Sequence, residues 1–203
     1  MMAGLNSDSD AILHLLKPGS VCAEIGVWEG HSSVKFFKTN PKMLYLVDPY
    51  STDGHIAAVK AGDPTFNYET YINAYGHIAG GKGEKAYMRK YDQVHAKVVK
   101  MFEGKDNVKV CRQKATDWFN EYNGEKLDWI YVDGDHSYTG VINDLENCRK
   151  IMKDDGIILG DDYKWDSLGD KAGVKKAVNE FVDRYGCSLQ RFGKNQFRIT
   201  KWA

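Results

Sequence analysis

Short apolar runs alternate along the chain with segments of helical periodicity. The apolar runs are typical of buried strands and fall at residues 21–27, 43–47, 108–111, 127–132 and 156–159. Between them, apolar side chains recur every three or four residues, which predicts helices at about residues 12–16, 32–37, 91–101, 137–152 and 174–185. After Gly193-Lys194-Asn195, Phe197 and Ile199 alternate with polar residues, which predicts a terminal hairpin of two strands.

Strands of nearly continuous apolar residues that alternate with helices are typical of a parallel sheet covered on both faces. The pattern therefore predicts an α/β fold with a doubly wound, mostly parallel, seven-stranded sheet of the Rossmann-like type. The hairpin would add an antiparallel C-terminal edge strand. We expect residues 1–203 to form a single domain.

An irregular segment at about residues 50–88 interrupts this pattern. It is rich in Gly, Tyr and His, and long loops of this kind usually have a function. We expect it to cover a substrate, although its tyrosines could equally serve packing alone. These tyrosines are Tyr68, Tyr71, Tyr75 and Tyr87.

Composition narrows the classes of partner. The chain has 28 basic and 28 acidic residues, a net charge of zero and a pI of about 7.0. No basic field is therefore present to attract nucleic acid or an acidic membrane, and we expect neither partner. The four cysteines lie far apart without a CxxC pair, and the apolar stretch 11–16 is too short for a signal-peptide core. We expect a cytoplasmic protein with reduced thiols, in which a homo-oligomer is possible.

A glycine-rich turn follows the first predicted strand, in the sequence EIGVWEG. It departs from GxGxxG, because Trp28 occupies the position of the central glycine and Gly30 comes four residues after Gly26. A cofactor without a pyrophosphate fits this turn better, with Glu24 meeting an ammonium group directly or through water. Asp48 ends the second strand, where it can accept hydrogen bonds from ribose hydroxyls. Alternatively, the glycines serve only the tight turn and Asp48 caps a loop.

Carboxylates follow the fourth and fifth predicted strands. Asp133 ends the fourth, and Asp161 and Asp162 come directly after the fifth. If these strands are neighbours, the three side chains converge and repel one another unless a cation neutralises them. Oxygen ligands favour Mg²⁺, Ca²⁺ or Mn²⁺. His136 is a natural proton acceptor, since its ordinary pKa is about 6.5. Alternatively, these residues have structural roles only: Asp133 and Asp135 form an Asp-Gly turn with a helix cap, and Asp161 and Asp162 lie in a solvated loop.

Three segments resemble a known family: EIGVWEG, LVDPY and DWIYVDGDHSYTGVINDLENCRKIMKDDGIILGDDY. The sequence is similar, over roughly residues 20–165, to class I S-adenosylmethionine-dependent methyltransferases of the "methyltransferase domain 24" type. That group is similar to metal-dependent macrolide-sugar O-methyltransferases, and more distantly to catechol and caffeoyl-coenzyme A O-methyltransferases.

The resemblance implies roles for individual residues. Asp133, Asp161 and Asp162 would bind a divalent metal, expected to be Mg²⁺, and His136 would act with Asp133 in catalysis. Asp162 stands where the catechol-type enzymes have asparagine. The residues expected to bind S-adenosylmethionine are Glu24, Gly26, Trp28, Gly30, Ser32, Asp48, Ala115, Thr116 and Asp133.

We therefore expect metal-assisted methylation of a hydroxyl group on a small molecule, a sugar or a phenol. Two other functions remain open from the residues. A nicotinamide-dependent oxidoreductase would require a pyrophosphate-binding GxGxxG turn, which Trp28 disfavours. A non-catalytic domain could keep the fold and bind the cofactor without turnover.

Overall fold

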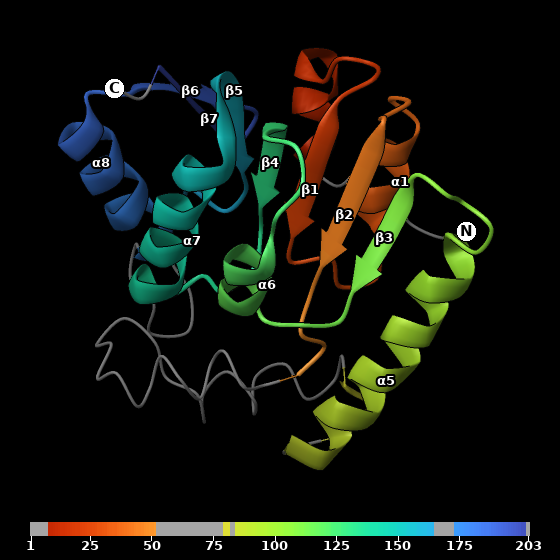
Figure 1. Ribbon diagram of the computed structural model, residues 1–203. Coiled ribbons are helices and arrows are strands. Elements are labelled where there is room, and N and C mark those ends of the chain that lie inside the picture. The colour runs from red at the N-terminus through yellow and green to blue at the C-terminus, as the bar shows by residue number, and fades with distance from the viewer. Residues whose placement is uncertain (1–7, 52–78, 82–83, 165–172, 202–203) are drawn as a thin grey trace.

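A computed structural model of the chain describes residues 8–51, 79–81, 84–164 and 173–201. Within these ranges the strands form a single sheet, and Figure 1 shows helices packed against both of its faces. The strands are β1 (Val21–Ile25), β2 (Met43–Val47), β3 (Val108–Cys111), β4 (Leu127–Val132), β5 (Met152–Gly160), β6 (Ser188–Phe192) and β7 (Gln196–Thr200). The helices are the 3₁₀ helix η1 (Asp8–Leu15), α1 (His31–Phe37), α5 (Glu84–Met101), α6 (Ala115–Glu121), α7 (Tyr138–Ile151) and α8 (Gly173–Tyr185).

The sheet has the order β3-β2-β1-β4-β5-β7-β6. Strands β1 to β5 pair in parallel, while β7 runs antiparallel to both β5 and β6. The chain order reverses between β1 and β4, and ligands of such sheets bind beyond the carboxyl ends of the strands at this point. The predicted fold class, with its antiparallel C-terminal hairpin at one edge, is confirmed.

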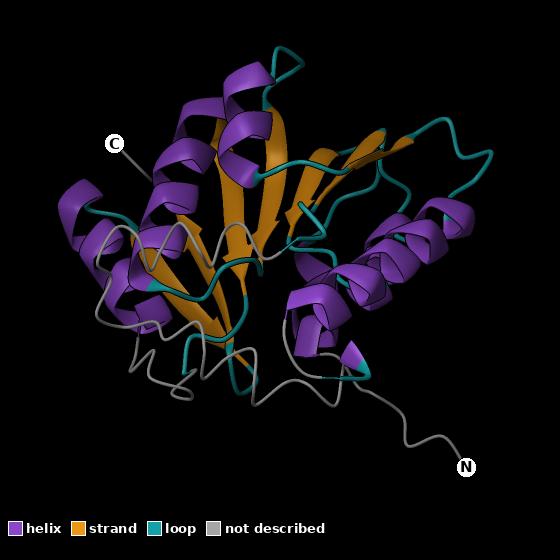
Figure 2. Cartoon of the chain, turned by 90° about the horizontal axis from the view of Figure 1, so that it is seen from below, coloured by secondary structure: helices purple, strands orange, loops and turns teal. Residues whose placement is uncertain are grey.

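Alternation along β4 shows how the two layers are built. Trp129 and Tyr131 face the layer that contains α1, and both rings contact Phe36, with centroids 5.3 and 4.9 Å apart. Ile130 and Val132 face the opposite layer, which α6, α7 and α8 cover. Each buried side chain of this size stabilises the fold by about 1.5–3 kcal/mol. Figure 2, seen from the strand ends, shows the sheet between its helices.

Three elements differ from the sequence prediction. Helix α5 begins at Glu84, because Ala86 and Tyr87 extend its buried face by a turn. Helix α6 was not predicted, since its buried side chains, Trp118 and Phe119, are adjacent and show no helical spacing. Strand β5 begins at Met152, which pairs with Leu127 ahead of a register shift.

Parts of the sequence prediction fall outside the described residues. Tyr68, Tyr71 and Tyr75 are among these, whereas Tyr87 lies on α5 with only 3% of its surface exposed. The cysteines are free thiols, as expected; Cys187 is half-buried and the others are buried. Among the described helices, none combines the length and the apolar character that crossing a membrane requires.

Asp144 on α7 gives the fold a testable dependence on pH. It is 6% exposed, and burial, with a further contribution from the charge of Asp135, raises its pKa to about 8. The folded protein therefore keeps a proton on Asp144 between about pH 4 and pH 8, where the unfolded chain has lost it. Folding stability contributed by this group consequently falls as the pH rises through that window.

We predict that Asp144→Asn, which cannot ionise, gains stability relative to the parent protein as the pH rises from 5 to 8. The difference in unfolding free energy should grow by up to about 1.4 kcal/mol per pH unit. Urea denaturation of both proteins at several pH values measures it. A difference that stays constant with pH would contradict a buried, protonated Asp144.

Candidate active site at the strand ends

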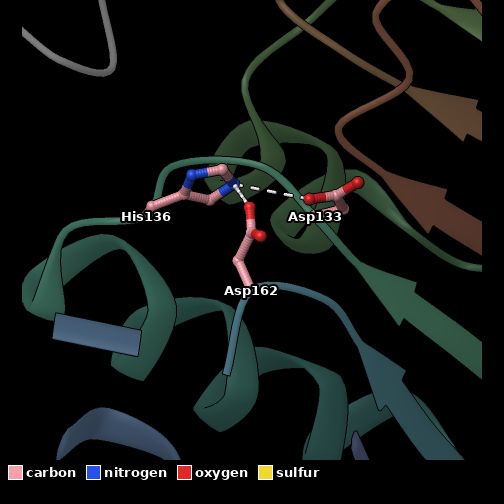
Figure 3. Close-up of side chains that lie close together, drawn as sticks. All are labelled: Asp133, His136 and Asp162. Carbon is pink, nitrogen blue, oxygen red and sulfur yellow. Dashed lines mark hydrogen bonds and ion pairs between the residues drawn. The ribbon is translucent and has the colours of Figure 1, made fainter. Parts of the chain in front are cut away.

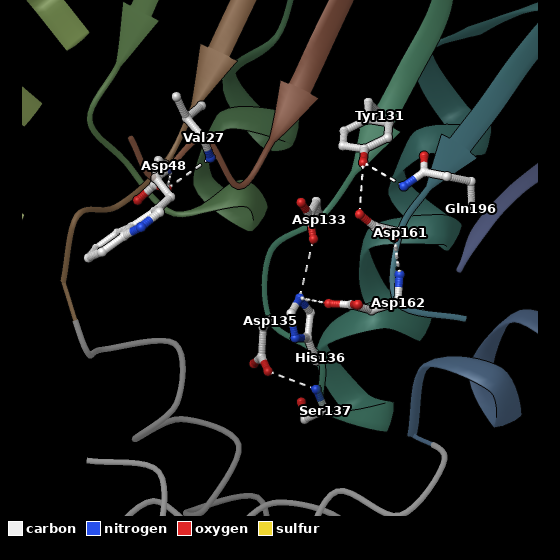
Figure 4. Close-up of polar contacts among 11 residues, drawn as sticks. Val27, Asp48, Tyr131, Asp133, Asp135, His136, Ser137, Asp161, Asp162 and Gln196 are labelled. Atoms are coloured by element: carbon white, nitrogen blue, oxygen red, sulfur yellow. Dashed lines mark hydrogen bonds and ion pairs between the residues drawn. The ribbon is translucent and has the colours of Figure 1, made fainter. Parts of the chain in front are cut away.

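Acidic side chains gather at the carboxyl ends of β2, β4 and β5. Strands β4 and β5 are neighbours, and Val132 pairs with Gly160, so Asp133 and Asp161 follow at the same level of the sheet. The condition on which the predicted carboxylate cluster depended is therefore met. Figure 4 shows Asp48 at the end of β2 and the remaining acids at the ends of β4 and β5.

The turn after β1 is packed too tightly for side chains at its glycines. Gly26 has a φ of +86°, and a Cβ there would lie 2.0 Å from the carbonyl oxygen of Asp133. Gly30 has a φ of +74°, and a Cβ there would lie 3.3 Å from Cγ2 of Val98 on α5. Both glycines thus serve the close approach of the turn to neighbouring segments, and Gly26 brings it against the loop that carries Asp133.

The side chain of Trp28 packs against α5. Its ring meets that of Tyr91 edge to face at 5.5 Å, and the ammonium group of Lys90 lies 5.8 Å from its centroid. Trp28 has a φ of +48°. Trp28 therefore contributes to the turn through its backbone N–H, which donates a hydrogen bond to Asp48, the residue after β2.

Asp48 joins the end of β2 to the turn after β1. Its Oδ2 accepts the backbone N–H groups of Val27 and Trp28, each at 2.9 Å, and its Oδ1 accepts that of Tyr50 at 2.7 Å. Burial raises the pKa of Asp48, and these three hydrogen bonds oppose the rise. A carboxylate has about four acceptor positions, so these donors leave one for a further hydroxyl.

Glu24 and Ser32 lie on either side of this turn. Glu24 on β1 is 1% exposed and accepts a hydrogen bond from the hydroxyl of Ser33 on α1. Burial raises the pKa of Glu24 well above its ordinary value. Ser32 donates to the hydroxyl oxygen of Ser9 on η1 at 3.2 Å. Both residues thus hold α1 in place beside the turn.

Ala115 and Thr116 open α6, directly beyond the end of β3. Ala115 is half-buried against the core and Thr116 is exposed. They lie at the same end of the sheet as Asp48, where the sequence prediction places the adenine of the cofactor.

Asp133, His136 and Asp162 form the tightest group at the strand ends, shown in Figure 3. Nε2 of His136 lies 3.4 Å from Oδ1 of Asp133 and 3.4 Å from Oδ2 of Asp162. The three side chains are between 17% and 30% exposed, so the group is open to a ligand on one side. We call these residues the strand-end cluster.

The start of α7 fixes the position of His136. Ser137 is the N-cap, and its side chain accepts the backbone N–H of Gly140 at 3.0 Å. Oδ1 of Asp135 accepts the backbone N–H of Ser137 at 2.9 Å. Such caps stabilise a helix start by about 0.5–2 kcal/mol. Asp135 therefore supports the N-cap residue through a hydrogen bond to its backbone, and His136, which lies between the two, is held over the strand ends.

His136 carries a positive charge between the two carboxylates of the strand-end cluster. Burial alone would lower the pKa of His136, but the hydrogen bond to Asp133 and the charges of Asp162, Asp133 and Asp135 outweigh it and raise the pKa to about 9. Burial raises the pKa of Asp133, and the contact with His136 opposes that rise. An imidazolium thus offsets one of the two negative charges, and a divalent cation would offset both.

The donor set also fits a divalent cation. One ligand atom from each residue of the strand-end cluster lies within 4.8 Å of the others. Atoms that share an ion at ligand distances of 2.0–2.6 Å are separated by at most about 5 Å. Oxygens of Asp133 and Asp162 are therefore close enough to share one ion, with the imidazole nitrogen of His136 beside it.

Asp161 lies differently from the other predicted metal ligands. Its Oδ2 accepts a hydrogen bond from the hydroxyl of Tyr131 at 3.3 Å, and its Oδ1 accepts the backbone N–H of Asp162 at 2.7 Å. Within the described part of the chain, His136 takes its place in the group whose ligand atoms meet.

Two polar residues near Asp161 were missed at the level of sequence. Tyr131 belongs to the apolar run of β4, and Gln196 begins β7; both are fully buried. Burial raises the pKa of Tyr131 well above its ordinary value, and the charges of Asp133 and Asp161 raise it further. The hydroxyl of Tyr131 therefore keeps its proton and remains a donor. A tyrosine two residues before Asp133 was the available signal.

Comparison with known proteins identifies the family of the chain. A family model described as "Methyltransferase domain", of the type numbered 24, matches residues 23–163, which is more than half of the chain. The chain belongs to this methyltransferase family. Among curated proteins, none matches it in sequence.

Solved structures share the fold across nearly the whole chain. A Clostridium thermocellum protein described as an rRNA methylase is 12% identical, with a TM-score of 0.62, and 100% of this chain and 98% of that chain are covered. A Streptococcus mutans protein described as a methyltransferase, in complex with SAH, is 14% identical, with a TM-score of 0.56 and 99% coverage of both chains. The O-methyltransferase TomG from Streptomyces achromogenes, in complex with SAM, is 13% identical, with a TM-score of 0.57 and coverage of 98% and 82%.

The packing at Gly26 predicts a large loss of stability in Gly26→Ala, because the added Cβ meets the backbone of Asp133. Gly104→Ala is the matched control, since Gly104 also has a positive φ, +71°, but has nothing within 4 Å of a Cβ. The control should lose about 1–2 kcal/mol from backbone strain, and Gly26→Ala about 1–3 kcal/mol more from overpacking. Chemical denaturation of both variants measures the two losses, and equal losses would contradict the tight packing of this turn.

Proposed function

We propose that this methyltransferase transfers the methyl group of S-adenosylmethionine to a hydroxyl group of a small molecule, with the help of a divalent cation such as Mg²⁺. The observation that carries the proposal is the strand-end cluster, two carboxylates and an imidazole that converge beside the glycine turn. Such a cluster is positioned where ligands of open α/β sheets bind.

The turn after β1 suits S-adenosylmethionine better than a dinucleotide. It lacks GxGxxG, and Trp28 takes the place of the glycine that would let a pyrophosphate approach. Asp48 would use its remaining acceptor position for a ribose hydroxyl, and Ala115 and Thr116 would lie along the adenine. Glu24, Gly26, Gly30 and Ser32 would shape the floor and the rim of the pocket.

Asp133 and Asp162 would hold the cation, and Asp161, the third acid at these strand ends, would be the further ligand. A cation bound there would lower the pKa of a substrate hydroxyl and fix its orientation. If a divalent cation balanced the charges of the two carboxylates, these charges would no longer favour the imidazolium. The pKa of His136 would then fall back toward its ordinary value. His136 can then accept the proton of the hydroxyl, a contribution of about 10²–10⁴ in rate.

The acceptor is proposed to be a sugar or a phenol. The net charge of zero gives no general attraction for nucleic acid, so a small molecule is favoured even though one structural neighbour is described as an rRNA methylase. We place the protein in the cytoplasm without a membrane or nucleic-acid partner, as a monomer or a homo-oligomer.

We predict that Asp133→Ala abolishes methyl transfer while S-adenosylmethionine still binds, because the substitution removes a cation ligand and leaves the backbone beside Gly26 intact. Turnover should fall at least about 100-fold, measured with labelled cofactor against a panel of sugars and phenols. Calorimetry should give a much smaller loss of cofactor affinity, because the other expected cofactor residues are unchanged. Asp154→Ala is the control, since that side chain is fully exposed at the far end of β5. Equal loss of binding and turnover would count against a metal role for Asp133.

Titrations with S-adenosylmethionine and with NAD⁺, each with and without Mg²⁺, separate the proposal from the two other functions. We expect the protein to bind S-adenosylmethionine but not NAD⁺. Turnover should be lost on adding EDTA and restored by Mg²⁺. Binding of NAD⁺ would favour an oxidoreductase. Binding of S-adenosylmethionine with indifference to chelators and no turnover would favour a non-catalytic domain.

A further inference from the structure

A row of hydrogen bonds leads from the interior of the sheet to the strand-end cluster. Nε2 of Gln196 on β7 donates to the hydroxyl oxygen of Tyr131 on β4 over 3.2 Å. The hydroxyl of Tyr131 donates to Oδ2 of Asp161 over 3.3 Å, and Oδ1 of Asp161 accepts the backbone N–H of Asp162 over 2.7 Å. Figure 4 shows this row, which we call the Gln196–Tyr131–Asp161 relay, ending at the residue that faces His136.

The sheet order brings the relay together. Strand β5 lies between β4 and β7, so Tyr131 and Gln196 approach its tip from the two neighbouring strands. Gly160, the last residue of β5, pairs with Val132 on one side and Phe197 on the other. Residues 65 positions apart in the sequence therefore meet beside Asp161.

Packing alone does not account for these residues. Tyr131 and Gln196 are both 0% exposed, and polar groups removed from water cost free energy unless they are hydrogen-bonded. A phenylalanine and an apolar residue would fill the same space without that cost. The ring of Tyr131 is also held by Phe36, with centroids 4.9 Å apart, so its hydroxyl has a fixed direction.

The relay ends at Asp162, whose backbone lies in the left-handed region. Asp162 has a φ of +57°, in the left-handed region that residues other than glycine rarely adopt. Its own N–H is held by the carboxylate of Asp161, and its side chain reaches Nε2 of His136 at 3.4 Å. The carboxylate of Asp161 therefore bonds the backbone of the residue whose side chain faces His136.

We propose that the relay is a positioning device, in which Gln196 and Tyr131 hold the turn that aims Asp162 at the bound cation. The inference rests on the metal-assisted function proposed above and deepens it. Neither Gln196 nor Tyr131 would touch the ion. Groups that orient metal ligands in this way change metal affinity by about 10–100-fold when they are removed.

Binding of Mn²⁺, followed by electron paramagnetic resonance, tests the proposal in Tyr131→Phe. The dissociation constant for Mn²⁺ should rise about 10–100-fold, while the affinity for S-adenosylmethionine stays unchanged. Tyr185→Phe is the matched control, because it also removes a tyrosine hydroxyl bonded to an acid, Glu146 at 2.6 Å, but on the outer helices. Parent-like Mn²⁺ affinity in Tyr131→Phe would overturn the proposal.

A double-mutant cycle tests the order of the relay. Gln196→Met should weaken Mn²⁺ binding in the parent protein but have no further effect in the Tyr131→Phe background, because Gln196 acts through the hydroxyl. Additive losses would overturn this order.

The backbone amide signal of Asp162 in a ¹H–¹⁵N spectrum gives a readout that needs no metal. Tyr131→Phe should displace this signal, whereas Tyr185→Phe should not. If the parent protein binds no Mn²⁺, the metal-assisted function fails, and the amide signal still decides whether the relay positions Asp162. An unmoved signal would overturn the relay.

Discussion

Negative charge at the ends of β4 and β5 has to be neutralised, and the candidate site is organised around this requirement. Asp133 and Asp162 point at one nitrogen of His136, each at 3.4 Å. Two carboxylates so close repel strongly in a partly buried place unless a positive charge lies between them. The imidazolium provides that charge here, and the same geometry accommodates a divalent cation. The proposed chemistry depends on this exchange of one positive group for another.

The surrounding fold gives the charges little freedom to separate. Parallel pairing of β4 with β5 sets the level of both acids, and the cap of α7 holds His136 over them. Gly26 brings the turn after β1 against the backbone of Asp133, and Asp48 ties that turn to β2. The segments expected to bind the cofactor and the cation are thus packed against each other.

Sequence alone predicts the gathering of acids but not how each one points. Acids directly after apolar runs indicate strand ends, and parallel sheets place strand ends together, so Asp133, Asp161 and Asp162 were predicted to converge. The separate orientation of Asp161 follows from the left-handed φ of Asp162 and from Tyr131, which no local pattern reveals. Gln196 was missed because its contact depends on pairing between β5 and β7. Helix α6 was missed because its two buried side chains are adjacent, whereas the helices that were predicted show apolar side chains at helical spacing.

Anomalous diffraction from crystals soaked with Mn²⁺ and S-adenosylmethionine would locate a cation bound at the strand ends. We expect a manganese peak at about 2.0–2.6 Å from carboxylate oxygens of both Asp133 and Asp162, with the sulfonium methyl group of the cofactor facing the same space. A peak elsewhere, or a fully occupied cofactor with His136 still paired to both acids and no manganese between them, would contradict this expectation.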